Sequence, residues 1–96
     1  MSAGKPIVTV YSTPLCGFCS AAKRLLDQKG VAYTEIDVQR DASKREEMIE
    51  RTGRQTVPQI FFGDRHIGGF DELNALERSG ELQKALAAEF QTLQTK

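Results

Sequence analysis

The sequence predicts an α/β domain built on one mixed four-stranded sheet with helices on both faces. Three observations predict it. Short runs rich in β-branched residues alternate with segments of helical periodicity. A helix-length segment separates the first two predicted strands, and such a connection joins parallel strands by a right-handed crossover. Further on, a Gly63-Asp64 turn between two short apolar runs indicates an antiparallel hairpin.

The first half of the chain predicts a strand, a helix and a second strand. Residues 6–11, PIVTVY, are rich in β-branched side chains. The helix is expected to begin near Gly17 and to end at Gly30, which suits a helix C-cap. Residues 31–38 alternate in character and indicate the second strand. The residues at helical spacing within the helix are Ala22, Leu25, Leu26 and Lys29.

A second helix is predicted over residues 43–53. Ser43 and Glu46 have the spacing of a capping box at its start, and Gly53 suits its end. Its small apolar stripe consists of Met48 and Ile49.

A hairpin and two helices are predicted to complete the chain. The hairpin strands are expected at 60–62 and 65–67. Asp71 is the expected N-cap of a short third helix, which Ser79 and Gly80 interrupt. The apolar positions of the last helix are Leu82, Leu86, Phe90 and Leu93. The expected order of elements is therefore β-α-β-α-β-β-α-α.

Bulk properties indicate a small soluble protein. We expect a single domain over residues 1–96, with frayed ends at 1–5 and 92–96. Hydrophobic residues make up 40% and charged residues 27% of the chain, and the formal net charge is +0. Because no stretch is markedly basic, we expect neither nucleic-acid nor membrane-surface binding. A charged leader and an apolar run of about 20 residues are both missing, which predicts a cytoplasmic location.

The two cysteines, Cys16 and Cys19, lie in the motif CGFC and allow three interpretations. A structural disulfide is disfavoured because so small a ring restricts the unfolded chain little. A zinc site is disfavoured because such sites usually take four ligands, and only His66 could join the two cysteines. His66 is expected to be a partly exposed residue of a strand. A CxxC motif that follows a strand and opens a helix is typical of a redox pair.

The predicted position of Cys16, just outside the first turn of a helix, suits a nucleophile. Unpaired backbone N–H groups and the positive end of the helix dipole meet there, and both favour the thiolate over the thiol. Cys19 lies one turn further along on the same side and is expected to be less exposed. That placement suits a resolving thiol, which attacks the mixed disulfide formed by Cys16.

Two further loops carry recognisable ligand-binding features. In TVPQ, Pro58 begins a strand, which is a position that proline tolerates. In IGGFDEL, two glycines precede a helix N-terminus, where the backbone can approach a ligand and N–H groups can bind a carboxylate. Asp71 is expected to cap that helix or to pair with an ammonium group of a ligand.

From about Ile7 to Leu86 the chain resembles the glutaredoxins. The resemblance rests on CGFC after the first strand, TVPQIF before the hairpin, and HIGGFDEL at the third helix. The segment KREEMIERTGRQTVPQIF is also very similar to the small dithiol glutaredoxins of bacteria. Thioredoxins typically carry WCGPC, whereas this chain contains no tryptophan.

The resemblance implies a thioredoxin fold and a glutathione-dependent thiol–disulfide oxidoreductase. By position, Cys16 is the nucleophile that becomes glutathionylated and Cys19 is the resolving cysteine. Glutathione would pair with the backbone of Thr56 and Val57 as an added strand, with Pro58 in the cis form. Binding of this kind is a known way for a protein to recognise an extended peptide. The residues implied to bind glutathione are Thr13, Phe18, Gln55, Thr56, Val57, Pro58, Gly69, Phe70 and Asp71.

Two departures from the family pattern affect the expected glutathione site. Thr13 stands where many glutaredoxins have a lysine that pairs with the glycyl carboxylate of glutathione, which would cost about 1 kcal/mol of charge-assisted binding. Gln55, Arg54 and Lys23 are the residues expected to compensate. Phe70 replaces a cysteine or a small polar residue, a change that binding through backbone N–H groups tolerates.

The third departure is in the active-site motif, where dithiol glutaredoxins usually have CPYC. CGF instead resembles the monothiol CGFS class, which carries [2Fe–2S] clusters. Gly17 makes the turn looser than proline would, so Cys16 thiolates from two chains could share a cluster with two glutathiones. The alternative function is therefore a cluster carrier that acts as a homodimer and uses Cys16 as a ligand.

The sequence thus predicts a glutaredoxin that reduces glutathione mixed disulfides and protein disulfides. Glutathione is the expected co-substrate, and proteins that carry glutathione or a disulfide are the expected partners. We expect a monomer, except where a cluster bridges two copies.

Overall fold

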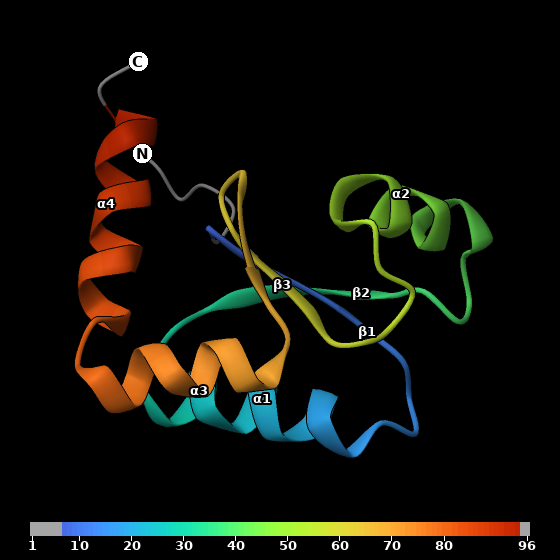
Figure 1. Ribbon diagram of the computed structural model, residues 1–96, viewed down its shortest axis with the longest axis horizontal. Coiled ribbons are helices and arrows are strands. Elements are labelled where there is room, and N and C mark those ends of the chain that lie inside the picture. The colour runs from blue at the N-terminus through green and yellow to red at the C-terminus, as the bar shows by residue number, and fades with distance from the viewer. Residues whose placement is uncertain (1–6, 95–96) are drawn as a thin grey trace.

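The computed structural model describes the backbone of residues 7–94 and the side chains of residues 7–89. Within this part of the chain the elements follow the predicted order, β-α-β-α-β-β-α-α (Figure 1). The frayed end predicted at 1–5 lies outside the described residues, as do positions 95–96 of the other end. The elements are β1 Val8–Ser12, α1 Gly17–Gln28, β2 Tyr33–Asp37, α2 Ala42–Thr52, β3 Gln59–Phe62, β4 Arg65–Gly68, α3 Phe70–Ser79 and α4 Leu82–Gln94.

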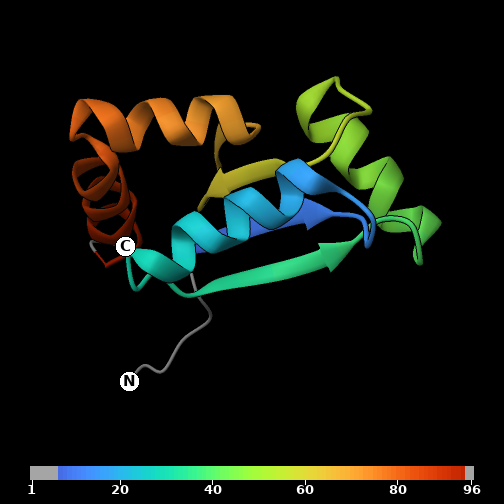
Figure 2. The same cartoon turned by 90° about the horizontal axis from the view of Figure 1, so that it is seen from below.

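The sheet is mixed, as predicted, with the strand order β2-β1-β3-β4. β1 and β2 are parallel, whereas β3 is antiparallel to both β1 and β4 (Figure 2). In the register between β1 and β3, Tyr11 lies opposite Gln59. The end of β1, which leads to the cysteines, therefore lies beside the segment that enters β3.

Alternating side chains of the central strands contribute to two apolar clusters. On one face, Val10 and Phe62 pack with Leu26 of α1 and Leu73 of α3, and α4 extends this cluster. On the other face, Tyr11 and Phe61 pack with Met48 of α2, together with Val38. Figure 1 shows α1 and α3 side by side on one face of the sheet and α2 on the other. The predicted helix cover on both faces is thus confirmed.

Capping of α2 differs from the sequence prediction. The N-cap is Asp41, whose carboxylate accepts hydrogen bonds from the backbone N–H groups of Ser43 and Lys44. The predicted capping box of Ser43 and Glu46 is therefore wrong. The physical reason is that the Asp41 carboxylate reaches two unpaired N–H groups at once and also accepts the Ser43 hydroxyl at 2.7 Å. At the other end, Gly53 closes the helix in the left-handed conformation, as predicted.

The start of α3 also differs, and the difference matters for the candidate site. Its N-cap is Gly69, so the prediction of Asp71 as N-cap is wrong, and Asp71 lies in the first turn. Glu72 replaces it as the capping side chain, because its carboxylate accepts the Gly69 N–H at 2.8 Å. The predicted interruption at Ser79 and Gly80 is confirmed.

The remaining differences are shifts of boundaries. The C-cap of α1 is Lys29, one residue before the predicted Gly30, which follows with a φ of +69°. The second strand is shorter than the predicted 31–38. In α4, Leu82 and Leu86 contact the core, while the side chains of Phe90 and Leu93 lie outside the described ones. None of the helices within residues 7–94 combines the length and apolar character needed to cross a membrane.

Candidate active site

Cys16 occupies the N-cap of α1, as the sequence predicted. Its backbone is extended, with φ −129° and ψ 111°, and the helix begins at the next residue. The Sγ atom accepts the backbone N–H of Cys19 at 3.1 Å and lies 3.8 Å from the carbonyl oxygen of Val57. The sulfur is half-buried. It therefore remains accessible, next to a backbone donor and the N-terminal end of the helix.

Cys19 has the contrasting environment. Its side chain is 1% exposed and neither cysteine is in a disulfide. Burial, followed by the hydrogen bond with Cys16, raises the pKa of the Cys19 thiol to about 12. At neutral pH this thiol is protonated, and Cys16 is the more exposed of the two cysteines.

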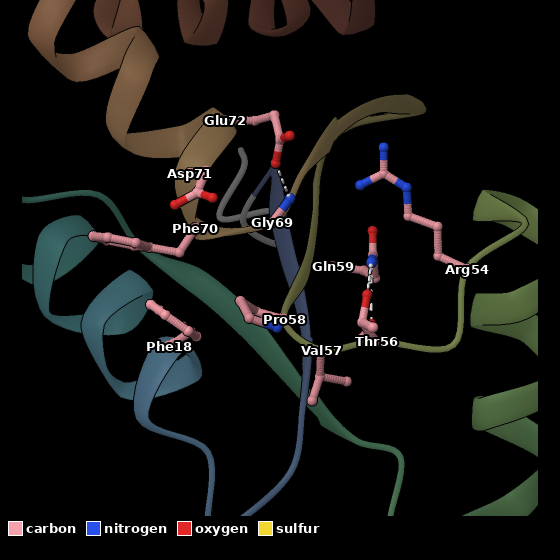
Figure 3. A pocket seen from close by; sticks show the side chains of 10 residues that line it. All are labelled: Phe18, Arg54, Thr56, Val57, Pro58, Gln59, Gly69, Phe70, Asp71 and Glu72. Atoms are coloured by element: carbon pink, nitrogen blue, oxygen red, sulfur yellow. Dashed lines mark hydrogen bonds between the residues drawn. The ribbon is translucent and has the colours of Figure 1, made fainter.

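A pocket of about 230 Å³ is lined by Phe18 of the cysteine motif and by Val57, whose carbonyl oxygen lies near the Cys16 sulfur (Figure 3). Neither cysteine is among its lining residues. Three separate segments form it: the first turn of α1, the segment that enters β3, and the first turn of α3. Seven of the predicted binding residues line it, but Thr13 and Gln55 do not. The lining residues are Phe18, Arg54, Thr56, Val57, Pro58, Gln59, Gly69, Phe70, Asp71 and Glu72.

One wall of the pocket is the segment that enters β3, and it offers backbone groups to a ligand. The register with β1 ends at Gln59, so Thr56 and Val57 precede the paired part of the strand. The Val57–Pro58 peptide bond is cis, as the resemblance implied. An extended ligand along this wall would add to the backbone as a further strand does.

The opposite wall is the N-terminus of α3, and it requires close approach of the backbone. A Cβ at Gly69 would lie 3.4 Å from the carbonyl oxygen of Pro58, so a side chain there would crowd the two walls. Gly68 has a φ of +124°, and a Cβ there would lie 2.7 Å from Glu72. The Glu72 carboxylate accepts a hydrogen bond from the Gly69 N–H, and this bond holds the pKa of Glu72 below its usual value. Glu72 therefore stays charged at the rim of the pocket.

Two aromatic rings close one end of the pocket. Phe18 stacks on Phe70 with ring centroids 6.2 Å apart and an interplanar angle of 24°. Phe18 is 65% exposed, so this pair presents apolar surface next to the cysteine motif. Figure 3 shows both rings on the side of the pocket away from Arg54.

The structure distinguishes between the two cations that the sequence offered for this site. Lys23 is paired with Glu35 at 2.8 Å, and the same carboxylate oxygen also accepts the Ser12 hydroxyl at 2.7 Å. Arg54, in contrast, lines the pocket. The sequence analysis did not identify Gln59 or Glu72 as site residues, although the spacing of Gly69 and Glu72 is that of a capping pair.

Comparisons with known proteins agree with this geometry. Residues 8–67 match the family model described as Glutaredoxin. The chain belongs to the glutaredoxin family. It is 49% identical over 79 residues to Glutaredoxin 3 of Escherichia coli strain K12, which covers 82% of this chain and 95% of that protein. It is 45% identical over 83 residues to a glutaredoxin of Pseudomonas aeruginosa, covering 86% of this chain and 99% of that one.

Among solved structures, this glutaredoxin is similar to the buckwheat glutaredoxin–glutathione complex. The TM-score is 0.80 at 33% sequence identity, with 88% of this chain and 79% of the buckwheat chain covered. The predicted thioredoxin fold is confirmed, and membership of the family makes this chain a thiol–disulfide oxidoreductase.

The contrast between the cysteines predicts selective alkylation. At neutral pH, iodoacetamide should modify Cys19→Ser quickly, through Cys16, and Cys16→Ser slowly, because burial dominates the raised pKa of Cys19. The slow rate should still rise about tenfold per pH unit above pH 9, since the thiolate fraction grows until the pKa is reached. Mass spectrometry of quenched samples measures both rates. The assignment is contradicted if the two variants react equally fast when folded, while equal rates in urea are the control.

Proposed function

We propose that this glutaredoxin reduces glutathione mixed disulfides and protein disulfides with glutathione as co-substrate. The observation that carries the proposal is the placement of the Cys16 sulfur beside a pocket whose two walls offer backbone groups to a peptide. Glutathione is a short peptide with a thiol at its centre and carboxylates at its ends. Support also comes from the buckwheat glutaredoxin, which was solved as a glutathione complex.

In the proposed reaction of a glutathione mixed disulfide, the Cys16 thiolate attacks the glutathione sulfur. A disulfide forms between Cys16 and glutathione, the substrate disulfide breaks, and the substrate sulfur leaves as a thiolate that takes up a proton. The thiolate of a second glutathione then attacks the bound glutathione sulfur. Oxidised glutathione leaves, and the Cys16 thiolate is restored at the helix N-terminus.

For a protein disulfide, Cys16 first forms a mixed disulfide with the substrate. Cys19 then loses its proton and attacks the Cys16 sulfur, which releases the reduced substrate and leaves a Cys16–Cys19 disulfide for two glutathiones to reduce. The intermediate itself favours this step. The hydrogen bond and the charge of Cys16 both raise the pKa of Cys19, and both are lost when Cys16 becomes a disulfide.

The proposed glutathione pose follows the pocket. The cysteinyl residue pairs with Thr56 and Val57, and the γ-glutamyl carboxylate meets the N–H groups at the start of α3, where Asp71 faces the ammonium group. Arg54 is the proposed partner of the glycyl carboxylate. Thr13 and Gln55 do not line the pocket and stay predictions for contacts outside it.

The decisive experiment is glutathione-dependent reduction of a small glutathione mixed disulfide. Cys16→Ser should lower kcat/KM by at least about 100-fold, because no other accessible sulfur remains. Cys19→Ser should keep a substantial part of the activity on this substrate and lose it on a protein disulfide. The assay follows oxidised glutathione through a coupled reductase. An inactive but folded wild-type protein would contradict the proposed function.

A matched pair of variants tests the assignment of Arg54. Arg54→Gln should raise the KM for the glutathione substrate about tenfold, equivalent to ~1.4 kcal/mol, because a charge-assisted contact is lost. Lys23→Gln should leave KM within about twofold, since Lys23 pairs with Glu35 rather than with the pocket. Steady-state kinetics give both values. The reverse ranking would assign the carboxylate to Lys23.

A second candidate function is carriage of a [2Fe–2S] cluster by a homodimer. Such clusters take four ligands, and one chain can supply only Cys16, because Cys19 is buried. Two chains and two glutathiones would complete the set. A second chain could approach Cys16 from the side of Gly17, where a Cβ would meet nothing within 4 Å. The turn that carries Cys16 is thus open on this side.

The variant Gly17→Pro tests the cluster hypothesis. Gly17 is the first residue of α1, a position where proline is well tolerated, so the variant should fold. If a looser turn permits the cluster, reconstitution with iron, sulfide and glutathione should give visible absorbance and a dimer with wild type and little of either with the variant. Equal cluster content in both proteins would refute the role of Gly17, and a colourless monomeric wild type would refute carriage.

A further inference from the structure

Gln59 is a buried polar residue that connects the pocket to the far strand of the sheet. Its side chain is 1% exposed, and all its polar atoms are paired. The Nε2 atom donates to the carbonyl oxygen of Thr56 at 3.0 Å and to its hydroxyl at 3.2 Å, as Figure 3 shows. The Oε1 atom lies 2.7 Å from Nε2 of His66 on β4. Gln59 therefore links Thr56 to His66.

Chemistry permits one arrangement of protons in this chain of contacts. A backbone carbonyl only accepts hydrogen bonds, so the amide nitrogen of Gln59 must face Thr56. The amide oxygen then faces His66, and an oxygen at 2.7 Å requires a proton on the imidazole Nε2. Neutral His66 is thereby restricted to the Nε2–H tautomer.

The same arrangement prepares Thr56 for a ligand. The Thr56 hydroxyl oxygen accepts a hydrogen bond from the Gln59 amide, which leaves the hydroxyl's own proton free to donate. The Thr56 carbonyl is held by the same amide group, so the backbone ahead of the cis peptide bond is held in one place. Thr56 and Val57 form the wall at which a peptide would add as a strand.

We propose that His66 and Gln59 are positioning residues that hold Thr56 ready for glutathione, with His66 kept as the Nε2–H tautomer. The proposal rests on the proposed function, because it concerns the same pocket. Neither side chain has a reacting role: Gln59 orients Thr56, and His66 orients Gln59.

Packing and charge around His66 are consistent with this role. Its ring packs on the ring of Phe61, with centroids 5.0 Å apart and an interplanar angle of 31°. Burial, followed by the nearby Arg54 guanidinium, lowers the pKa of His66. When His66 does gain a proton, it gains it on Nδ1, and the Nε2–H bond to Gln59 is unchanged.

The first test needs no variant and no glutathione. Nitrogen-15 NMR of wild type labelled at histidine reports the tautomer of His66, the single histidine of the chain. We expect Nε2 protonated and Nδ1 unprotonated at neutral pH. The opposite tautomer would overturn the proposal, whatever the enzyme does.

The second test compares variants of His66. His66→Phe keeps a flat ring against Phe61 but removes the donor, whereas His66→Gln restores an amide N–H near the position of Nε2. His66→Phe should raise the KM for a glutathione mixed disulfide about threefold to tenfold with kcat within about twofold, and His66→Gln should stay near wild type. Arg65→Ala, an exposed change on the same strand, is the matched control and should leave both constants unchanged.

Backbone amide spectra of the same variants separate the possible failures. Displaced Thr56 and Val57 resonances in His66→Phe, and near-native ones in His66→Gln, would support the positioning role even if the wild type showed no activity with glutathione. Such inactivity would refute the proposed function alone. Unchanged resonances and an unchanged KM in folded His66→Phe would refute the positioning role. If His66→Phe does not fold, the tautomer measurement still decides.

Discussion

The hydrogen bond from the Cys19 backbone N–H to the Cys16 sulfur defines the chemistry of this glutaredoxin. It is an N-cap interaction in which a cysteine sulfur takes the place of the usual hydroxyl or carboxylate. Because an N-cap residue precedes the helix, its sulfur stays accessible. Because Cys19 is inside the first turn, its sulfur points into the core and its pKa rises. One turn of helix thus makes two chemically different cysteines.

The sheet register then brings the pocket to this turn. β1 leads directly into the cysteine motif, and β3 lies beside β1 in the antiparallel direction, so the entry to β3 meets the exit from β1. The hairpin returns the chain along β4 to the start of α3, where Gly69 approaches Pro58. Three segments far apart in the sequence therefore surround one pocket, although none of them forms a site alone.

Two of the basic side chains near the sheet are held by partners away from the pocket. Lys23 pairs with Glu35, and Arg51 donates to the Tyr11 hydroxyl at 2.8 Å while stacking 3.7 Å above the ring of Phe61. Arg54 lies two residues before Thr56 and lines the pocket. This distribution leaves a cation at the end of the pocket opposite Phe18, which is where the proposed pose needs a partner for a carboxylate.

The sequence by itself determined the order of elements, the placement of the two cysteines at the start of a helix, and the family, because these depend on local patterns. The β-branched run before CGFC, the helical spacing after it and the Gly63-Asp64 turn are all short-range signals. Most of the predicted ligand-binding residues also came from motifs, and seven of them do line one pocket.

Only the tertiary structure decided which cation lines the pocket and which contacts Gln59 makes. The helix caps differ in kind, because Asp41 with Ser43 and Gly69 with Glu72 are local contacts, and the sequence offered more than one local candidate for each cap. Lys23 of α1 is paired with Glu35 of β2 and does not line the pocket. The Gln59 side chain contacts His66, which is seven residues away in the sequence and lies on the neighbouring strand. Such contacts depend on distances that folding creates, and no local pattern records them.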